Sequence, residues 1–114
     1  MLNLKKLLTM TLVSLATTSE TLTEGITITR CGRLRILKIN KSLSAAAIVT
    51  LPTADRPIVQ TNGAGRVLYN TKYYPALLTL TNGGNLSASY FDSGTTTVGG
   101  LTSGTLIAEL VYVV

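Results

Sequence analysis

The segment from Leu51 to Pro57, Leu-Pro-Thr-Ala-Asp-Arg-Pro, constrains the fold more than any other part of this 114-residue chain. Pro52 and Pro57 each fix φ, lack an N–H group and push the preceding residue toward extended backbone. Neither proline can therefore lie inside a central strand. Short runs in which apolar residues alternate with Thr and Ser flank the segment. This pattern predicts a rigid corner between two β-strands, turned without a helix.

Length and composition predict one packed β domain. A chain of 114 residues forms a single domain and buries about two thirds of the surface of the unfolded chain. Charged residues make up 13% and hydrophobic residues 46%, so apolar burial can offset the entropy lost on ordering. Trp is absent and aromatic residues make up 5%, so we expect a core of Leu, Ile, Val and Ala, with Thr at exposed strand positions.

Apolar runs between turn residues predict the strands. Residues 26–30 and 33–39 form a hairpin in which Gly32 supplies the positive φ of the turn. The apolar phase slips between Ile36 and Leu37, and a β-bulge explains the slip. Strands of this length and spacing predict an all-β fold, a single jelly-roll-like β-sandwich. The other strands are expected at 46–51, 58–61, 66–69, 76–81, 86–91 and 105–113, with turns at 62–65, 82–85, 92–94 and 98–100.

The N-terminus admits three interpretations. Lys5-Lys6 and the apolar run over 7–16 resemble a secretory signal. Apolar residues and Thr alternate over 8–12, however, and a period of two is typical of a half-buried strand. A short helical turn at the start is the third possibility. We favour an attachment segment over 1–24, too short to span a bilayer, followed by a head domain over 25–114.

The titratable residues argue against an enzyme. Histidine is absent and Cys31 is the single cysteine, so an intrachain disulfide is excluded and a metal-ligating or nucleophilic cysteine has no histidine partner. Asp55 and Asp92 are the only pair of acids in expected loops after the N-terminal segment, and a glycosidase would need such a pair. Turn hydrogen bonding, with Asp55 paired to Arg56, explains them more simply. We expect no catalytic residue, no metal and no cofactor.

The net charge of +5 is concentrated in one hairpin. Its basic residues are Arg30, Arg33, Arg35, Lys38 and Lys41. Such a cluster can meet nucleic acid, an anionic glycan or an acidic neighbouring subunit. Single-strand binders interleave basic residues with stacking aromatics, however, and no aromatic lies between Ile26 and Pro57. We therefore expect no nucleic-acid partner, and a solvated strand face that blunts a sheet edge.

The best candidate ligand site is the stretch around Tyr73 and Tyr74. Both rings lie beside Asn70 and Lys72 in an expected loop, and exposed aromatics with amide groups suit the binding of sugars. Adjacent strand residues point to opposite faces, so at least one ring should be exposed. The alternative is structural packing, with each ring buried and its hydroxyl bonded to the backbone.

Apolar side chains occupy both faces of the closing strand. Leu110, Tyr112 and Val114 share one face, whereas Val111 and Val113 share the other. Such a strand is either central and covered twice or partly buried by another subunit. Leu110, Tyr112 and Val114 are therefore candidate oligomer-interface residues, and burial wholly inside the monomer fits the pattern equally well.

The chain resembles the head domains of phage tail receptor-binding proteins over roughly residues 20–114. The resemblance rests on the Leu-Pro…Arg-Pro corner, on the Gly-Asn turn at Gly83-Gly84-Asn85-Leu86 and on the final apolar strand from Thr105 to Val114. It implies a non-enzymatic homotrimer of the tail or baseplate, made in the host cytoplasm. It further implies that the N-terminal segment binds other virion proteins and that the head binds host-surface saccharide without membrane insertion.

This chain departs from the family in having almost no shoulder or neck region. The alternative function is therefore a capsid decoration or head-fibre protein that binds only other virion proteins. A third possibility is a secreted bacterial adhesin whose N-terminus is a signal peptide, and mature protein starting near Thr17 would support it.

Overall fold

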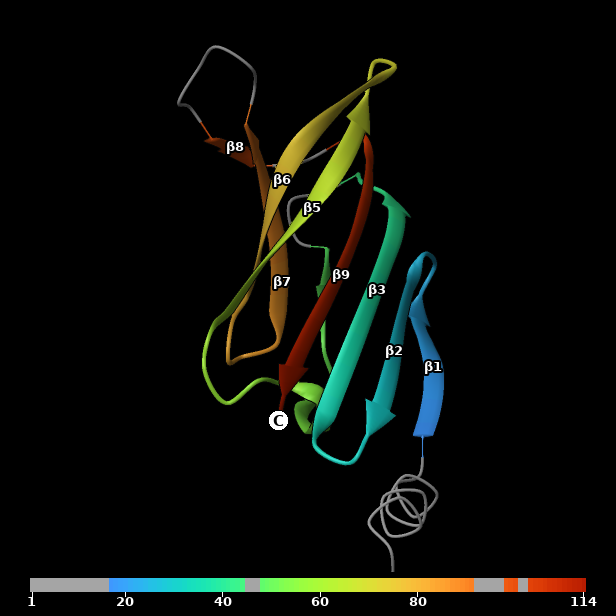
Figure 1. The fold of residues 1–114 in the computed structure, drawn as a ribbon, viewed down its shortest axis with the longest axis vertical. Helices are drawn as coiled ribbons and strands as arrows, with labels where there is room; N and C mark the ends of the chain where they lie inside the picture. The colour runs from blue at the N-terminus through green and yellow to red at the C-terminus, as the bar shows by residue number, and fades with distance from the viewer. Residues whose placement is uncertain (1–16, 45–47, 92–97, 101–102) are drawn as a thin grey trace, which may run out of the picture.

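A computed structural model describes residues 17–44, 48–91, 98–100 and 103–114 (Figure 1). Strands dominate these residues, and one short 3₁₀ turn, η1, lies between the fourth and fifth strands. The elements are β1 Thr17–Thr23, β2 Ile26–Cys31, β3 Leu34–Ser42, β4 Val49–Thr50, η1 Thr53–Asp55, β5 Thr61–Tyr69, β6 Lys72–Leu80, β7 Asn85–Phe91, β8 Val98–Gly100 and β9 Thr105–Val113.

The strands form one antiparallel sheet that curls into a nearly closed barrel, which confirms the all-β prediction. The strand order is β1-β2-β3-β9-β5-β6-β7-β4, with β8 added on β7. The structure thus has one curled sheet rather than two separate ones, and the two halves of this sheet face each other across the core (Figure 1). Closing strand β9 is central, because it lies between β3 and β5.

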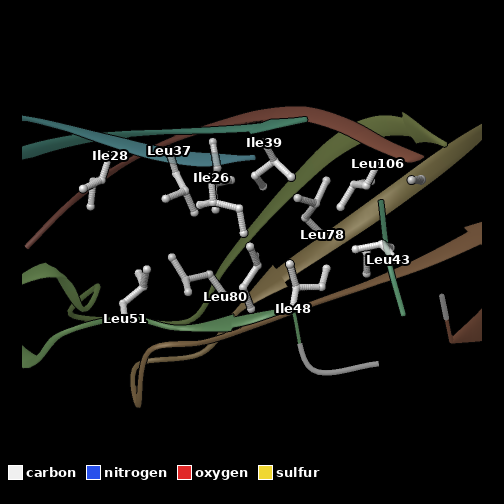
Figure 2. Close-up of a cluster of buried hydrophobic side chains, with 14 of the residues drawn as sticks. Ile26, Ile28, Leu37, Ile39, Leu43, Ile48, Leu51, Leu78, Leu80 and Leu106 are labelled. Carbon is white, nitrogen blue, oxygen red and sulfur yellow. The ribbon is translucent and has the colours of Figure 1, made fainter. Parts of the chain in front are cut away.

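The core consists of aliphatic side chains at alternate strand positions, as the composition predicted. Side chains from β2 and β3 point toward side chains from the opposite half of the sheet (Figure 2). Such interdigitation suits Leu and Ile, because they fill the space between two sheet layers without polar atoms. The largest fully buried apolar side chains are Ile26, Ile28, Leu37, Leu51, Leu78, Leu80, Leu86, Leu106 and Val67.

The prediction of a turn over 62–65 is wrong, because this stretch is the first half of β5. Its glycines allow close packing. A Cβ atom on Gly65 would lie 2.5 Å from the Ala108 Cβ and 2.7 Å from the Ile107 carbonyl oxygen on β9. A Cβ atom on Gly63 would lie 2.5 Å from Leu110 Cδ1. Glycine therefore serves strand packing here, a use of strand glycine that sequence alone does not separate from a turn.

The prediction of a β-bulge between Ile36 and Leu37 is also wrong. β3 pairs in unbroken register with β9, from Leu34 opposite Val113 to Ser42 opposite Thr105. Leu34 and Ile36 simply face outward, and the apolar phase slip reflects an outer surface that carries apolar side chains. The register irregularity lies instead in β1, between Thr21 and Thr23.

The Leu-Pro…Arg-Pro corner exists, but it contains the 3₁₀ turn η1, so the expectation of a corner without helix is corrected. Pro52 precedes the turn, and the Asp55 N–H donates to the Pro52 carbonyl oxygen at 2.9 Å. A proline at this position costs nothing, because the first N–H groups of a helix have no partner inside the helix. Leu51, Asp55 and Pro57 are buried, and the corner lies at one end of the barrel (Figure 1).

Several predicted boundaries shift. Residues 58–60 are an exposed loop, so the strand predicted at 58–61 is wrong except for Thr61, where β5 begins. Residues 98–100 form β8, although a turn was expected there. The turn expected at 92–94 lies outside the described residues. Gly32 has a φ of 58°, as predicted for its hairpin.

The expected attachment segment is described only over residues 17–24, since 1–16 lie outside the described residues. Residues Thr17–Thr23 form β1, which pairs with β2 along its length. Side chains of the first five residues of β1 are exposed, as is typical of a strand with a neighbour on one side only.

Candidate functional site

The β5–β6 hairpin carries all four candidate ligand residues and projects from one end of the barrel as an arm (Figure 1). Asn70 and Thr71 form its two-residue turn, with φ values of 48° and 65°. Two successive positive φ values match the twist of a tight antiparallel hairpin. Lys72 is the first residue of β6, and Tyr73 and Tyr74 follow it in the strand, so these two residues lie in a strand rather than in the expected loop.

Tyr73 lies on the outer face of the arm with its side chain 57% exposed. The Arg66 guanidinium lies over its ring, 4.9 Å from the ring centroid. Arg66 pairs with Pro75 in the ladder, so the contact runs diagonally across two strands. Such a cation–π contact holds an exposed ring in place and keeps the N–H donors of Arg66 beside it.

Tyr74 points to the other face and packs against the core. Its ring meets the Tyr90 ring edge to face, with centroids 6.0 Å apart and planes at 66°. The two adjacent tyrosines therefore divide as strand geometry requires, with Tyr73 outside and Tyr74 inside. Tyr69, at the end of β5, is a further exposed ring on the arm that the candidate set did not include.

The arm carries basic residues and no acidic ones. Arg66 and Lys72 are its basic residues, and no Asp or Glu occurs between Asp55 and Asp92. Exposed rings beside cationic donors form a surface that can stack on the apolar face of a sugar and hydrogen-bond its hydroxyl or anionic groups. Asn70, Lys72 and Tyr73 are all exposed near the tip of the arm, but Lys72 and Tyr73 are adjacent in β6 and therefore point to opposite faces of it.

A second polar cluster is buried at the opposite end of the barrel, around Asp55 of η1. Arg30 donates from Nε and Nη2 to Asp55 Oδ1 and Oδ2, both at 2.7 Å. Arg35 donates from Nε to Asp55 Oδ1 at 2.9 Å. Asp55 is only 1% exposed, and these bonds hold the pKa of its carboxyl below the usual 3.8, chiefly through Arg30. The same ion pair raises the pKa of Arg30 above its ordinary range.

The remaining polar groups of this cluster are also bonded. Arg35 Nη1 donates to the carbonyl oxygens of Gly32 and Leu34 at 2.7 and 3.0 Å. Tyr112 donates from its hydroxyl to the Asp55 carbonyl oxygen at 2.7 Å. Burial raises the pKa of Tyr112 to about 12, with the Asp55 charge adding to the effect. In the part of the chain that the structure describes, no buried side-chain nitrogen or oxygen lacks a partner.

This cluster changes the interpretation of the basic hairpin. Arg35 is buried and Arg30 is half-buried, and both are engaged by Asp55. Arg33 donates to the Val114 carbonyl oxygen at 2.7 Å, and Lys41 to the Glu24 carbonyl oxygen at 3.3 Å. Arg35 is therefore an internal residue and Arg30 and Lys41 are partly buried, whereas Arg33 and Lys38 are exposed, as predicted for a solvated strand face. The pairing of Asp55 with Arg56 is wrong, because Arg56 Nε donates instead to the Leu51 carbonyl oxygen at 3.1 Å.

Asp55 is also unsuited to acid–base chemistry, because both of its oxygens accept bonds from guanidinium groups. Asp92, the other member of the carboxylate pair considered above, lies outside the described residues. Within the described ranges, no three His, Cys, Asp or Glu side chains lie close enough together to hold a metal. A small polar pocket of about 190 Å³ lies near the β1–β2 turn, lined by Glu24, Asn40, Lys41 and Ser42.

The candidate oligomer residues of β9 lie largely inside the chain. Leu110 is 4% and Tyr112 is 6% exposed, and Val114 is partly buried against the core. Their neighbours Val111 and Val113 face outward and are each 52% exposed.

Comparison with known proteins gives no family. The chain matches no protein-family model, no curated protein and no solved structure at a significant level. Among the helices of the described residues, none is long and apolar enough to cross a membrane.

Proposed function

We propose that this chain is a non-enzymatic binding domain of a phage or prophage particle, and that its β5–β6 arm binds a saccharide of the host surface. The exposed Tyr73 ring, held beneath the Arg66 guanidinium, carries the proposal, and the exposed residues Asn70 and Lys72 lie at the tip of the same hairpin. The virion assignment rests on the resemblance to receptor-binding head domains.

The charge of the arm sets the class of saccharide. Arg66 and Lys72 belong to a stretch, between Asp55 and Asp92, that contains no Asp or Glu. A glycan that bears phosphate or carboxylate groups therefore suits the arm better than a neutral one. Arg66 presents a planar set of donors that matches the geometry of such anions. Tyr73 adds an apolar surface for the sugar ring.

The arm alone presents a small, open surface, for which we expect weak binding at one site. A homotrimer, attached to other virion proteins through its N-terminal segment, would present three arms to one polysaccharide. Linked sites of this kind raise apparent affinity by about 10² to 10⁴ without new contacts.

The test is binding of the full chain to an array of bacterial surface polysaccharides, both neutral and phosphate-bearing. Tyr73→Ala should weaken binding at least about tenfold, which corresponds to about 1.4 kcal/mol. Ile58→Ala is the matched control, because Ile58 is similarly exposed but lies in the loop before β5, away from the arm tip. Equal binding by Tyr73→Ala and the unaltered chain would contradict the role of the arm.

A capsid decoration or head-fibre protein is the second candidate function, and one observation favours it. Leu34 lies opposite Val113, and Ile36 opposite Val111, on the outer face of the sheet, and all except Ile36 are among the exposed large apolar residues. Clustered apolar side chains on a surface are typical of protein–protein contacts. Labelled chain at the tail tip of particles would support receptor binding, whereas label on the capsid surface would support decoration.

A further inference from the structure

The tip of the β5–β6 arm presents an exposed tyrosine on each of its two faces. Tyr73 occupies the outer face and is 57% exposed. Tyr69, the last residue of β5, is 45% exposed. The cross-strand partner of Tyr73 is Leu68, which shares its face, and Tyr69 follows Leu68 directly in the strand. Tyr69 and Tyr73 therefore lie on opposite faces of the arm.

The turn before β9 confirms which face Tyr69 occupies. A Cβ atom on Gly104 would lie 3.0 Å from Val67 Cγ2 and 3.5 Å from the Tyr69 Cβ atom. Val67 is fully buried in the core, so the Tyr69 side chain leaves β5 on the same, inner face. Gly104 has a φ of 88° and no side chain, which lets this turn pass close to the base of Tyr69.

Each ring has a basic residue on its own face. The Arg66 guanidinium lies over the Tyr73 ring on the outer face. Lys72 is directly opposite Tyr69 in the ladder, and such partners share a face with their Cβ atoms about 4.5 to 5.5 Å apart. An aromatic ring beside a cation thus occurs on the outer face and again on the inner face.

Within the described strands around the tip, no carboxylate offsets these charges. Residues 56–91 contain no Asp or Glu, and β9 begins opposite Leu68 with Thr105. Glu109, the acid of β9, lies farther from the tip and opposite Lys38 of β3. Both faces of the tip therefore suit an anionic ligand.

The tip is narrow, so one extended ligand can reach both faces. It projects beyond the ends of β3 and β9 (Figure 1). Among the described strands, β7 pairs with β6 only as far as Ala76, so residues 72–75 of β6 pair with β5 alone. The two strands of a hairpin are about 4.8 Å apart, and the exposed residues Asn70 and Thr71 form the turn. A polymer can pass around such a tip, whereas a single sugar contacts one face at a time.

We propose that Tyr69 and Lys72 form a second saccharide subsite, and that one acidic polysaccharide chain passes around the arm tip with one sugar on Tyr69 and another on Tyr73. This inference rests on the proposed function and extends it from one sugar to a stretch of polymer. Lys72 binds a phosphate or carboxylate group on the inner face, as Arg66 does on the outer face.

The test is a nuclear magnetic resonance titration of the full chain. The probe is the acidic polysaccharide that the array retains most strongly, cut into disaccharide and octasaccharide fractions. The octasaccharide should shift the Tyr69 and Tyr73 signals with one common dissociation constant. This constant should be at least about tenfold below that of the disaccharide, because one molecule then occupies two linked subsites. The disaccharide should shift the two signals with separate constants.

Tyr69→Ala should weaken octasaccharide binding at least about tenfold and leave the disaccharide response of Tyr73 unchanged. Tyr69→Phe keeps the ring and should retain octasaccharide binding, which separates loss of the ring from loss of the fold. Leu77→Ala is the matched control. Leu77 is 43% exposed on the same hairpin, but it lies opposite Ala64, away from the tip.

The other outcomes contradict the inference in distinguishable ways. If Tyr69→Ala bound the octasaccharide like the unaltered chain while Tyr73→Ala did not, the second subsite would be refuted and the proposed function would stand. Full binding by both variants, or no acidic polysaccharide retained on the array, would refute both. Tighter binding of oligothymidylate than of the octasaccharide would also refute both, because exposed rings beside cations can instead stack on nucleic-acid bases.

Discussion

Arg30 and Asp55 are joined by two parallel hydrogen bonds, from Nε to Oδ1 and from Nη2 to Oδ2, both 2.7 Å long. The pair ties β2 to η1, which is 25 residues away in the chain. Arg30 also contacts Glu20 of β1 at 2.8 Å, so the same guanidinium connects the edge strand to the corner. The conformation of the proline-bounded corner thus depends on an ion pair as well as on its two prolines.

Loss of the Asp55 charge should destabilise the fold strongly. Asp55→Asn leaves the buried Arg35 guanidinium without its anion, and breaking a buried pair in this way costs about 3 to 5 kcal/mol. Urea unfolding followed by circular dichroism measures the loss. Glu109→Gln is the control, because Glu109 is an exposed acid of β9 and its change should cost less than about 0.5 kcal/mol. Equal stability of the two variants would refute the structural role of the pair.

Acid should weaken the fold through the same carboxyl. Because Arg30 and Arg35 lower the pKa of Asp55, the folded chain binds this proton less readily than the unfolded chain. The stabilisation is therefore present above the ordinary pKa of 3.8 and is lost as pH falls below it, toward the folded pKa. Unfolding free energies measured from pH 5 to pH 2 should fall more steeply for the unaltered protein than for Asp55→Asn. Parallel profiles would contradict this prediction.

Alkali should weaken the fold through Tyr112. Burial raises the pKa of its hydroxyl from 10.0 to about 12, so between these values the unfolded chain loses the proton and the folded chain keeps it. The contribution of Tyr112 to stability is then constant below pH 10 and falls as pH rises toward 12, by at most about 3 kcal/mol. Tyr112→Phe should remove most of this pH dependence, at a cost of about 1 kcal/mol near neutral pH for the lost bond to the Asp55 carbonyl. If the unfolding free energy of Tyr112→Phe fell with pH as steeply as that of the unaltered protein, the Tyr112 hydroxyl would not be the cause.

Gly65 should tolerate no side chain. Gly65→Ala would bring a methyl group within 2.7 Å of the Ile107 carbonyl oxygen and still closer to Ala108, and such overpacking costs about 1 to 3 kcal/mol. Gly83→Ala is the matched control, because the nearest atom to a Cβ atom there is 3.7 Å away and its φ is not positive. Thermal unfolding of the two variants compares the costs. If both melted alike, β5 and β9 would not be as close as described.

The sequence was most informative where strand period and turn chemistry agree. The β2–β3 hairpin was predicted with its Gly32 turn, because alternating apolar residues on both sides of a glycine leave few other structures. The strands over 76–81, 86–91 and 105–113 were predicted within a residue or two of β6, β7 and β9, except that β6 starts earlier, at Lys72. Their alternation of apolar and small polar residues is the signal of a half-buried strand.

The errors have physical causes. Gly63 and Gly65 were interpreted as turn residues. Glycine serves both a turn that needs positive φ and a strand that packs closely against its neighbour, so the residue type alone does not separate the two. The bulge at Ile36 was inferred from the assumption that apolar residues face inward, whereas Leu34 and Ile36 lie on an apolar outer face. Pairing of Asp55 with Arg30 and Arg35 depends on contacts 25 and 20 residues apart, which local sequence does not encode. The candidate ligand residues were found from their residue types alone, although three of them, Lys72, Tyr73 and Tyr74, lie in a strand.

The solution mass of the full chain, measured by light scattering after size exclusion, tests the central claim of a trivalent binding domain most directly. We predict a trimer of about 36 kDa, three times the 12.1 kDa of one chain. A stable monomer of 12.1 kDa would contradict it, because one arm could not gain affinity from threefold presentation.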